Sequence, residues 1–396
     1  MRQINQHTKV KRDENRSFCF DDATERIYSP EEAVKFGLCT GAALDRGDRA
    51  VISFAGTNGS QPCAMAIASG LCAKGIECFV SEQGEEYFSG FCAEALCARL
   101  YIHVSAGAGI KISAAGRSGS PLDKQLLKNI TKNFLRSDHM ILSSKRQATV
   151  KYCDDLLKLY KARLDKQEKL NGIRVRIKTS SPLTAELFDS VIRDRNDING
   201  EEIVFNFSYD CKKVSAYSEK TGSVFYETLL LAAVYIAVNE GKTVVLPYSF
   251  PRAAELLHGD GKTVRLPFGE SITINNDNRF LTDSFILCMA IIDYISKNKM
   301  SLYDLLESVP SAYVFERYVY TGFGAENRLL NLIANKVLSE NAERSSAGGR
   351  VTARALKRGE GIMLISEAAS AETASSLCDE VEEYVKRASA NTCKDI

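Results

Sequence analysis

The sequence predicts an α/β protein of three serial α/β domains, the second and third shortened, followed by a small α+β domain. First, the chain has 396 residues, which exceeds the size of one ordinary core. Second, short apolar runs that are typical of buried strands alternate with segments of helical length and periodicity, as in βαβ units. Third, this alternation restarts near residue 150 and again near residue 243. We therefore expect a multidomain protein.

The first unit contains the clearest βαβ pattern. Its first helix has a strong start signal, because Ser29 can cap it and Pro30 and two glutamates follow in the first turn. A Gly-rich turn, AGTNGS, separates the first strand from the next helix. The predicted helices are at residues 29–44, 65–74, 87–98 and 122–135, and the predicted strands are at 50–54, 76–80, 101–105 and 109–113.

The later units repeat the pattern in shorter form. The second is predicted to contain a charged helix at 150–169, strands at 172–178 and 202–207, and a helix from Thr184. The third is predicted to contain strands at 243–247 and 263–266 and helices at 251–257 and 281–296. The last segment is predicted to contain a helix at 326–339, strands at 351–356 and 361–367, and a helix at 371–387. The predicted boundaries are an arm at 1–28, domain I at 29–149, domain II at 150–242, domain III at 243–315 and domain IV at 316–396.

Composition and charge argue against several kinds of site and partner. Lys and Arg number 51 against 50 Asp and Glu, so the net charge of +1 gives no sign of a nucleic-acid partner. The 12 cysteines include no Cys-x-x-Cys pair and there are only four histidines, so the ligand spacing of a structural zinc site is missing. We expect buried, reduced thiols instead.

The sequence also carries no sign of a membrane segment. Its first 18 residues are polar, unlike a signal peptide or a membrane anchor. The longest apolar run, TLLLAAVYIAV at 228–238, is shorter than the roughly 18–20 residues that span a bilayer, and it predicts a buried helix. We expect a cytoplasmic protein with no membrane partner.

Several segments carry a family resemblance. They include AVISFAGTNGSQPCAMAIASGLCAKGIECFV in the first unit, FSYDCKKVSAYSEKTGSVFYETLLLAAVYIA in the second and TVVLPYSFPRAAELL in the third. In this order they resemble the phosphoglucomutase and phosphomannomutase superfamily, the α-D-phosphohexomutases, over about residues 29–390. The match is closer still to the mutase-like module fused behind sugar nucleotidyltransferases. The resemblance implies a scaffold built for phosphoryl transfer between a serine and a sugar hydroxyl.

The resemblance implies a phosphorylated serine in a T-A-S-H-N-P loop, which this sequence lacks. The nearest stretch, VSAG at 104–107, puts Gly107 at the nucleophile position, and another alignment puts Ala115 there. Ser105 or Ser113 would have to act from two residues away. Side-chain alternation along a strand and the need for in-line attack disfavour both.

The family's magnesium loop, D-G-D-A-D-R, corresponds to SYDCKK at residues 208–213. In the family, three carboxylates meet one magnesium ion through oxygen ligands. Here Asp210 is the only carboxylate, and Lys212 stands where the third should be. Because an ammonium group repels a divalent cation, we expect no cofactor, and magnesium only if the protein is active.

The remaining family motifs are reduced as well. The R-D-T-R loop corresponds to FAGT at 54–57, which has no charged side chain. Lys111 corresponds to the G-I-K-L lysine that assists proton transfer in the family, and otherwise it is an exposed strand lysine. The phosphate loop R-P-S-G-T-E-P is reduced to Lys357, Arg358 and Gly359, which could still bind a phosphate weakly.

Three functions follow from these patterns. The first is a degenerate, catalytically inactive phosphohexomutase homologue that binds a hexose phosphate, or a partner protein such as a sugar nucleotidyltransferase. The alternative is an active phosphohexomutase that interconverts hexose 1- and 6-phosphates with Ser105 as nucleophile, helped by Asp210 and Lys111. The third is an unrelated α/β carbohydrate or nucleotide enzyme in which the loop at Gly56 and Gly59 cradles a phosphate at a helix N-terminus.

Overall fold

The computed structural model describes most of the chain. The described residues are 10–12, 18–20, 30–55, 59–81, 84–106, 110–136, 140–153, 155–166, 168–248, 250–267, 270, 272–310, 313–320, 330, 333, 336–337, 349–355 and 361–392. They gather into two compact units. Unit 1 consists of Met1–Tyr226, Val245–Tyr248 and Val264–Leu302, and unit 2 of Glu227–Val244, Ser249–Thr263 and Tyr303–Ile396. Because the two units interleave along the chain, the four predicted domain boundaries stay predictions.

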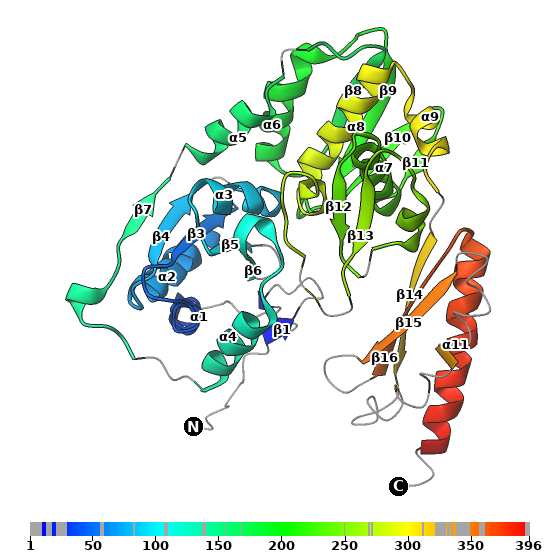
Figure 1. Cartoon of the computed structure of the whole chain (residues 1–396). Coiled ribbons are helices and arrows are strands. Elements are labelled where there is room, and N and C mark those ends of the chain that lie inside the picture. The colour runs from blue at the N-terminus through cyan, green and yellow to red at the C-terminus, as the bar shows by residue number, and fades with distance from the viewer. Residues whose placement is uncertain are drawn as a thin grey trace. The chain divides into compact units, whose positions relative to one another are not determined.

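Unit 1 contains a five-stranded sheet with the order β6-β5-β3-β4-β7 (Figure 1). Its strands are β3 (Arg49–Phe54), β4 (Glu77–Ser81), β5 (Leu100–Ala106), β6 (Ile110–Ala115) and β7 (Val150–Tyr152). All neighbours run parallel except β5 and β6, which are antiparallel. Helix α2 (Ser60–Cys72) connects β3 to β4 and completes the predicted βαβ unit.

The two faces of this sheet differ in chemistry because side chains alternate along each strand. One face carries Ile52, Ile102 and Ile112, which pack in the core with α1 (Pro30–Gly41), α2 and α4 (Lys124–Arg136). The opposite face carries a row of polar side chains at one register across four strands. This row consists of Ser81, Ser53, His103 and Ser113, and all four are buried.

A second sheet in unit 1 has the order β11-β10-β9-β8. Its strands are β8 (Ile173–Lys178), β9 (Glu201–Phe207), β10 (Val214–Ser218) and β11 (Gly222–Val224). The pair β8 and β9 is parallel, and α6 (Pro182–Ile192) lies between the two strands in sequence. Ser181 caps α6, since its Oγ accepts a hydrogen bond from the Thr184 N–H at 3.1 Å. The other helices of this unit are α3 (Ser89–Ala95), α5 (Leu156–Leu164) and α8 (Ser284–Asn298).

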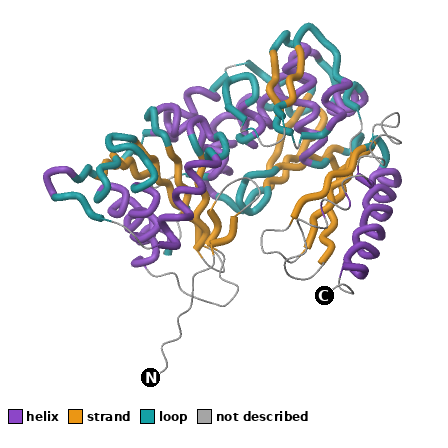
Figure 2. Tube along the Cα trace, turned by 60° about the horizontal axis from the view of Figure 1, so that its bottom comes forward, coloured by secondary structure: helices purple, strands orange, loops and turns teal. Residues whose placement is uncertain are grey.

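Unit 2 contains a three-stranded antiparallel sheet with the order β14-β16-β15. Its strands are β14 (Tyr313–Tyr320), β15 (Arg350–Ala355) and β16 (Gly361–Ala368). Figure 2 shows the long helix α11 (Ala371–Thr392) lying along this sheet. Val319, Ile362 and Leu377 belong to the core between them.

The remaining elements are short or bridge these parts in sequence. A hairpin of β1 (Val10–Arg12) and β2 (Phe18–Phe20) lies in the predicted arm. β12 (Thr243–Leu246) pairs with β13 (Lys262–Arg265). Helices α7 (Tyr226–Asn239) and α9 (Leu302–Glu307) also belong to these remaining elements. Helix α7 is buried along most of its length, as predicted. Among the described residues, no helix combines the length and the apolar composition needed to cross a bilayer.

Most predicted elements are confirmed, but two predictions were wrong and strand β14 was missed. The predicted charged helix at 150–169 begins only at Leu156, because residues 150–152 instead extend the first sheet beside β4. The predicted helix at 251–257 is a short 3₁₀ helix, Arg252–Leu256. Strand β14 was not predicted, although its aromatic residues favour a strand. The helix predicted at 326–339 lies largely outside the described residues.

Replacing Gly70 with alanine should destabilise unit 1. A Cβ atom at Gly70 would lie 2.5 Å from the Val34 carbonyl oxygen and 2.7 Å from the Leu38 nitrogen, both backbone atoms of α1. We expect a loss of about 1–3 kcal/mol in the free energy of unfolding, although Gly→Ala inside a helix otherwise stabilises. Urea denaturation of the wild type and the variant measures this difference in the free energy of unfolding. The matched control is Ser69→Ala at the adjacent exposed position, and equal stability of the two variants would show that α1 and α2 do not pack through this glycine.

Candidate functional site

The first sheet brings three of the sequence-predicted site residues together. Ser105 on β5 lies directly opposite Lys111 on β6 in the antiparallel register. Lys111 Nζ lies 3.4 Å from Asp210 Oδ2, and both side chains are about one-third exposed, at 35% and 38%. Lys111 is therefore not the exposed strand lysine that the sequence also allowed. Gly107 and the predicted phosphate loop at Lys357, Arg358 and Gly359 lie outside the described residues.

Asp210 lies in the turn between β9 and β10, where protein donors surround its carboxylate. Its Oδ1 accepts hydrogen bonds from Ser208 Oγ at 2.8 Å and from the Lys212 N–H at 3.2 Å. Its Oδ2 accepts from Lys111. Burial by itself would raise the pKa of Asp210, but these hydrogen bonds and the charges of Lys111 and Lys212 outweigh it and lower the pKa. The carboxylate is therefore ionised and already neutralised by lysine.

Lys212 forms a second ion pair at the same place. Its Nζ lies 2.5 Å from Glu86 Oε1, and both side chains are mostly buried. The neighbouring Glu85 accepts a hydrogen bond from Ser181 Oγ. Burial raises the pKa of Glu85, and the negative charges of Asp210 and Glu86 add to this shift. Two ammonium groups and three carboxyl groups therefore meet between the two sheets of unit 1.

These residues do not fit the magnesium ion that the sequence resemblance implies. A magnesium site needs carboxylate oxygens that face an open position. Here the Asp210 and Glu86 oxygens face Lys111 and Lys212. Within the described ranges, no three acidic, histidine or cysteine side chains gather closely enough to hold a metal ion.

The structure adds a polar network that sequence reasoning missed. His103 Nδ1 lies 2.8 Å from Ser53 Oγ, and Ser53 Oγ also contacts the Tyr101 hydroxyl. Tyr101 in turn donates to the Glu85 carbonyl oxygen at 3.3 Å. The signal was present in YIHVSA (101–106), where tyrosine, histidine and serine alternate with apolar residues and so share one face.

His103 is a neutral imidazole in this environment. Burial, together with the positive charges of Lys111 and Lys212, lowers its pKa to about 3, and the negative charge of Asp210 opposes this shift. The ring is 4% exposed. At neutral pH His103 can therefore offer one N–H donor and one lone pair.

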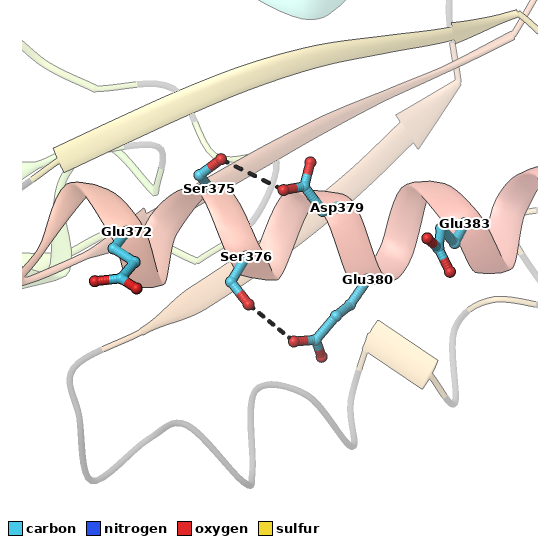
Figure 3. A pocket seen from close by; sticks show the side chains of 6 residues that line it. All are labelled: Glu372, Ser375, Ser376, Asp379, Glu380 and Glu383. Carbon is cyan, nitrogen blue, oxygen red and sulfur yellow. Dashed lines mark hydrogen bonds between the residues drawn. The ribbon is translucent and has the colours of Figure 1, made fainter.

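A separate hollow with a volume of 440 Å³ lies on α11 in unit 2 (Figure 3). Its lining residues are Glu372, Ser375, Ser376, Asp379, Glu380 and Glu383. Ser376 Oγ donates to Glu380 Oε1 at 3.0 Å, and Ser375 Oγ lies 3.5 Å from Asp379 Oδ2. A surface with this many carboxylates repels a phosphate group, so the hollow is no candidate for a sugar phosphate.

Comparison with known proteins gives the fold. No family model and no curated protein matches the sequence. Among solved structures, a phosphoglucomutase/phosphomannomutase family protein from Burkholderia thailandensis matches with a TM-score of 0.65 and 14% identity, over 96% of this chain and 98% of that one. The chain has the phosphohexomutase fold.

Two further relatives of the phosphohexomutase fold match over nearly the whole chain. The parafusin pp63 of Paramecium, a phosphoglucomutase, has a TM-score of 0.61 and 10% identity over 90% of this chain and 92% of that chain. An N-acetylglucosamine-phosphate mutase of the α-D-phosphohexomutase superfamily has a TM-score of 0.52 and 10% identity over 96% of both. The resemblance predicted from sequence is thus confirmed for the fold, and the chemistry depends on this chain's own residues.

Replacing His103 with asparagine should change how stability depends on pH. The folded protein holds the pKa of His103 at about 3, whereas the unfolded chain titrates near the ordinary value of about 6.5. The unfolded state therefore binds the extra proton between these values, and the wild type loses up to ~1.4 kcal/mol per pH unit as the pH falls through this window. The stability advantage of the wild type over His103→Asn should shrink from pH 7 to pH 4.5 in urea denaturation.

The wild type must be compared with the variant because protonation of Asp283 stabilises the folded protein at low pH, whereas protonation of His103 destabilises it. Burial raises the pKa of Asp283 to about 6, so this residue contributes stability at low pH that is lost as the pH rises. This contribution is common to both proteins and cancels in the difference. Parallel pH curves for wild type and variant would contradict a buried neutral His103.

Proposed function

We propose that this protein is a catalytically inactive homologue of the phosphohexomutases that binds a hexose phosphate without transferring its phosphoryl group. The observation that supports the proposal is that two lysine–carboxylate ion pairs form at the candidate site. Lys111 with Asp210, and Lys212 with Glu86, neutralise the carboxylates that a divalent cation would need. The ammonium groups of Lys111 and Lys212 thus supply the positive charge that a divalent cation would supply.

Phosphoryl transfer needs more than positive charge near the serine. The reaction requires a positioned nucleophile, a cation that neutralises charge on the transferred group, and phosphate anchors. Ser105 has a cation opposite it, but Lys111 is already paired with Asp210. With the metal ligands replaced, the chain lacks the group that would activate the reaction, which supports the inactive form over the active mutase.

Retained binding is supported by the polar face of the first sheet. Burying hydroxyl and imidazole groups costs free energy unless each finds a partner, and an apolar face would be more stable. Ser53, Tyr101 and His103 keep such groups next to Lys111 and Asp210. We propose that the sugar portion of the ligand lies here. Phosphate binding by Lys357 and Arg358, which the sequence predicts, is a separate proposal. A partner protein, such as a sugar nucleotidyltransferase, and a cytoplasmic location complete the proposal.

The proposal predicts binding without turnover. Purified protein is mixed with glucose 1-phosphate, mannose 1-phosphate or the corresponding 6-phosphates, with and without magnesium. Calorimetry should detect binding that is the same with and without magnesium, because Lys111 and Lys212 already pair with the carboxylates of Asp210 and Glu86. Phosphorus NMR should detect no conversion between 1- and 6-phosphates.

Magnesium-dependent conversion would instead establish the active mutase. In that case Ser105→Ala should abolish conversion, whereas the matched control Ser190→Ala, at an exposed position on α6, should leave it unchanged. If none of the four sugar phosphates binds, the hexose phosphate is excluded and the protein partner becomes the function to test.

A further inference from the structure

The hydrogen bonds around Ser53 have only one consistent direction. The Tyr101 hydroxyl donates its single hydrogen to the Glu85 carbonyl oxygen, which cannot donate. In its contact with Ser53 Oγ, Tyr101 is therefore the acceptor and Ser53 the donor. Because the serine hydrogen is used, Ser53 Oγ must accept from His103, so the proton of the neutral ring lies on Nδ1.

This tautomer leaves Nε2 of His103 with a lone pair and no proton. In the described part of the chain, Nε2 has no hydrogen-bond partner. The fully buried polar atoms without a partner in this part are Thr40 Oγ1, Arg195 Nη1, Glu201 Oε1, and Nε and Nη1 of Arg279. Nε2 of His103 is not among these atoms, and the residue as a whole is 4% exposed.

A fixed, unprotonated imidazole nitrogen selects the chemistry of its ligand. It accepts a hydrogen bond from a hydroxyl or N–H group, whereas the dianionic phosphate group of a sugar phosphate has no hydrogen to donate. The charges around it lead to the same conclusion. Lys111 and Lys212 are both paired with carboxylates, so neither of these two ammonium groups is left unpaired to attract a phosphate to this position.

We propose that Nε2 of His103 accepts a hydrogen bond from a hydroxyl group of the sugar ring, in a subsite formed by the polar face of the first sheet. His103 shares this face with Ser105 and Lys111, which lie one step further along the strands. The inference rests on the proposed binding of a hexose phosphate and deepens it, because it separates the site of the sugar from that of the phosphate.

The first test uses the wild-type protein and needs no variant. In a sample with ¹⁵N-labelled histidine, His103 should show a protonated Nδ1 and an unprotonated Nε2 at pH 7. Addition of glucose 1-phosphate should move the Nε2 resonance in the direction of hydrogen-bond acceptance, and methyl phosphate, whose dianion carries no hydroxyl group, should not move it. A proton on Nε2 in the free protein would overturn the inference.

The second test is the variant His103→Asn, which also identifies the His103 signals. The asparagine amide can replace the Nδ1–H that donates to Ser53, but it has no atom at the position of Nε2. We expect affinity for glucose 1-phosphate to fall about tenfold by calorimetry, while affinity for methyl phosphate stays unchanged. The matched control is His258→Asn, at an exposed histidine in unit 2, and circular dichroism verifies that both variants fold.

The possible failures are distinguishable. If the wild type binds glucose 1-phosphate and His103→Asn binds it equally well, the inference is wrong and the proposed function stands. If affinity for methyl phosphate falls in parallel with that for the sugar phosphate, His103 acts on the phosphate and the inference is also wrong. If the wild type binds no sugar phosphate, the proposed function fails and the inference fails with it.

Discussion

The alternation of side chains along β3, β5 and β6 is the constraint on which the rest of unit 1 depends. It directs Ile52, Ile102 and Ile112 into the core with α1, α2 and α4. The same alternation directs Ser53, Tyr101 and His103 to the opposite face. A slip of one residue in register would exchange the two faces, placing polar groups in the apolar core and isoleucines among the polar side chains of the other face. The core and the polar site are therefore two consequences of one strand register.

The ion pairs at this site balance the charges of two carboxylates by means of two lysines. Carboxylates that cluster around a cation repel one another when the cation is absent. In this chain the cations are covalently part of the protein, since Lys111 and Lys212 lie against Asp210 and Glu86. These pairs link β6 and the short 3₁₀ helix that contains Glu86 to the turn after β9, so they contribute to the contacts between the two sheets of unit 1.

Sequence reasoning succeeded where the signal was local. The order β3, α2 and β4 follows from apolar runs, a Gly-rich turn and helical periodicity. It failed where the structure of a segment depends on a distant strand. Residues 150–152 form a strand because they pair with the edge of β4, and local residue propensities do not predict this pairing. The role of His103 was missed for a similar reason. A single histidine in a strand does not indicate a polar network unless the neighbouring strand is known to place Ser53 beside it and Tyr101.

By itself, the sequence determined the fold class, and it predicted that the family's metal ligands are replaced, because both inferences depend on the types and order of residues along the chain. Lys212 at a carboxylate position is visible without any structure. Only the tertiary structure decided that Lys212 pairs with Glu86, that Lys111 pairs with Asp210, and that Nε2 of His103 keeps its lone pair. These are relations between residues up to 126 positions apart, as between Glu86 and Lys212, and burial with cross-strand register, not local preference, creates them.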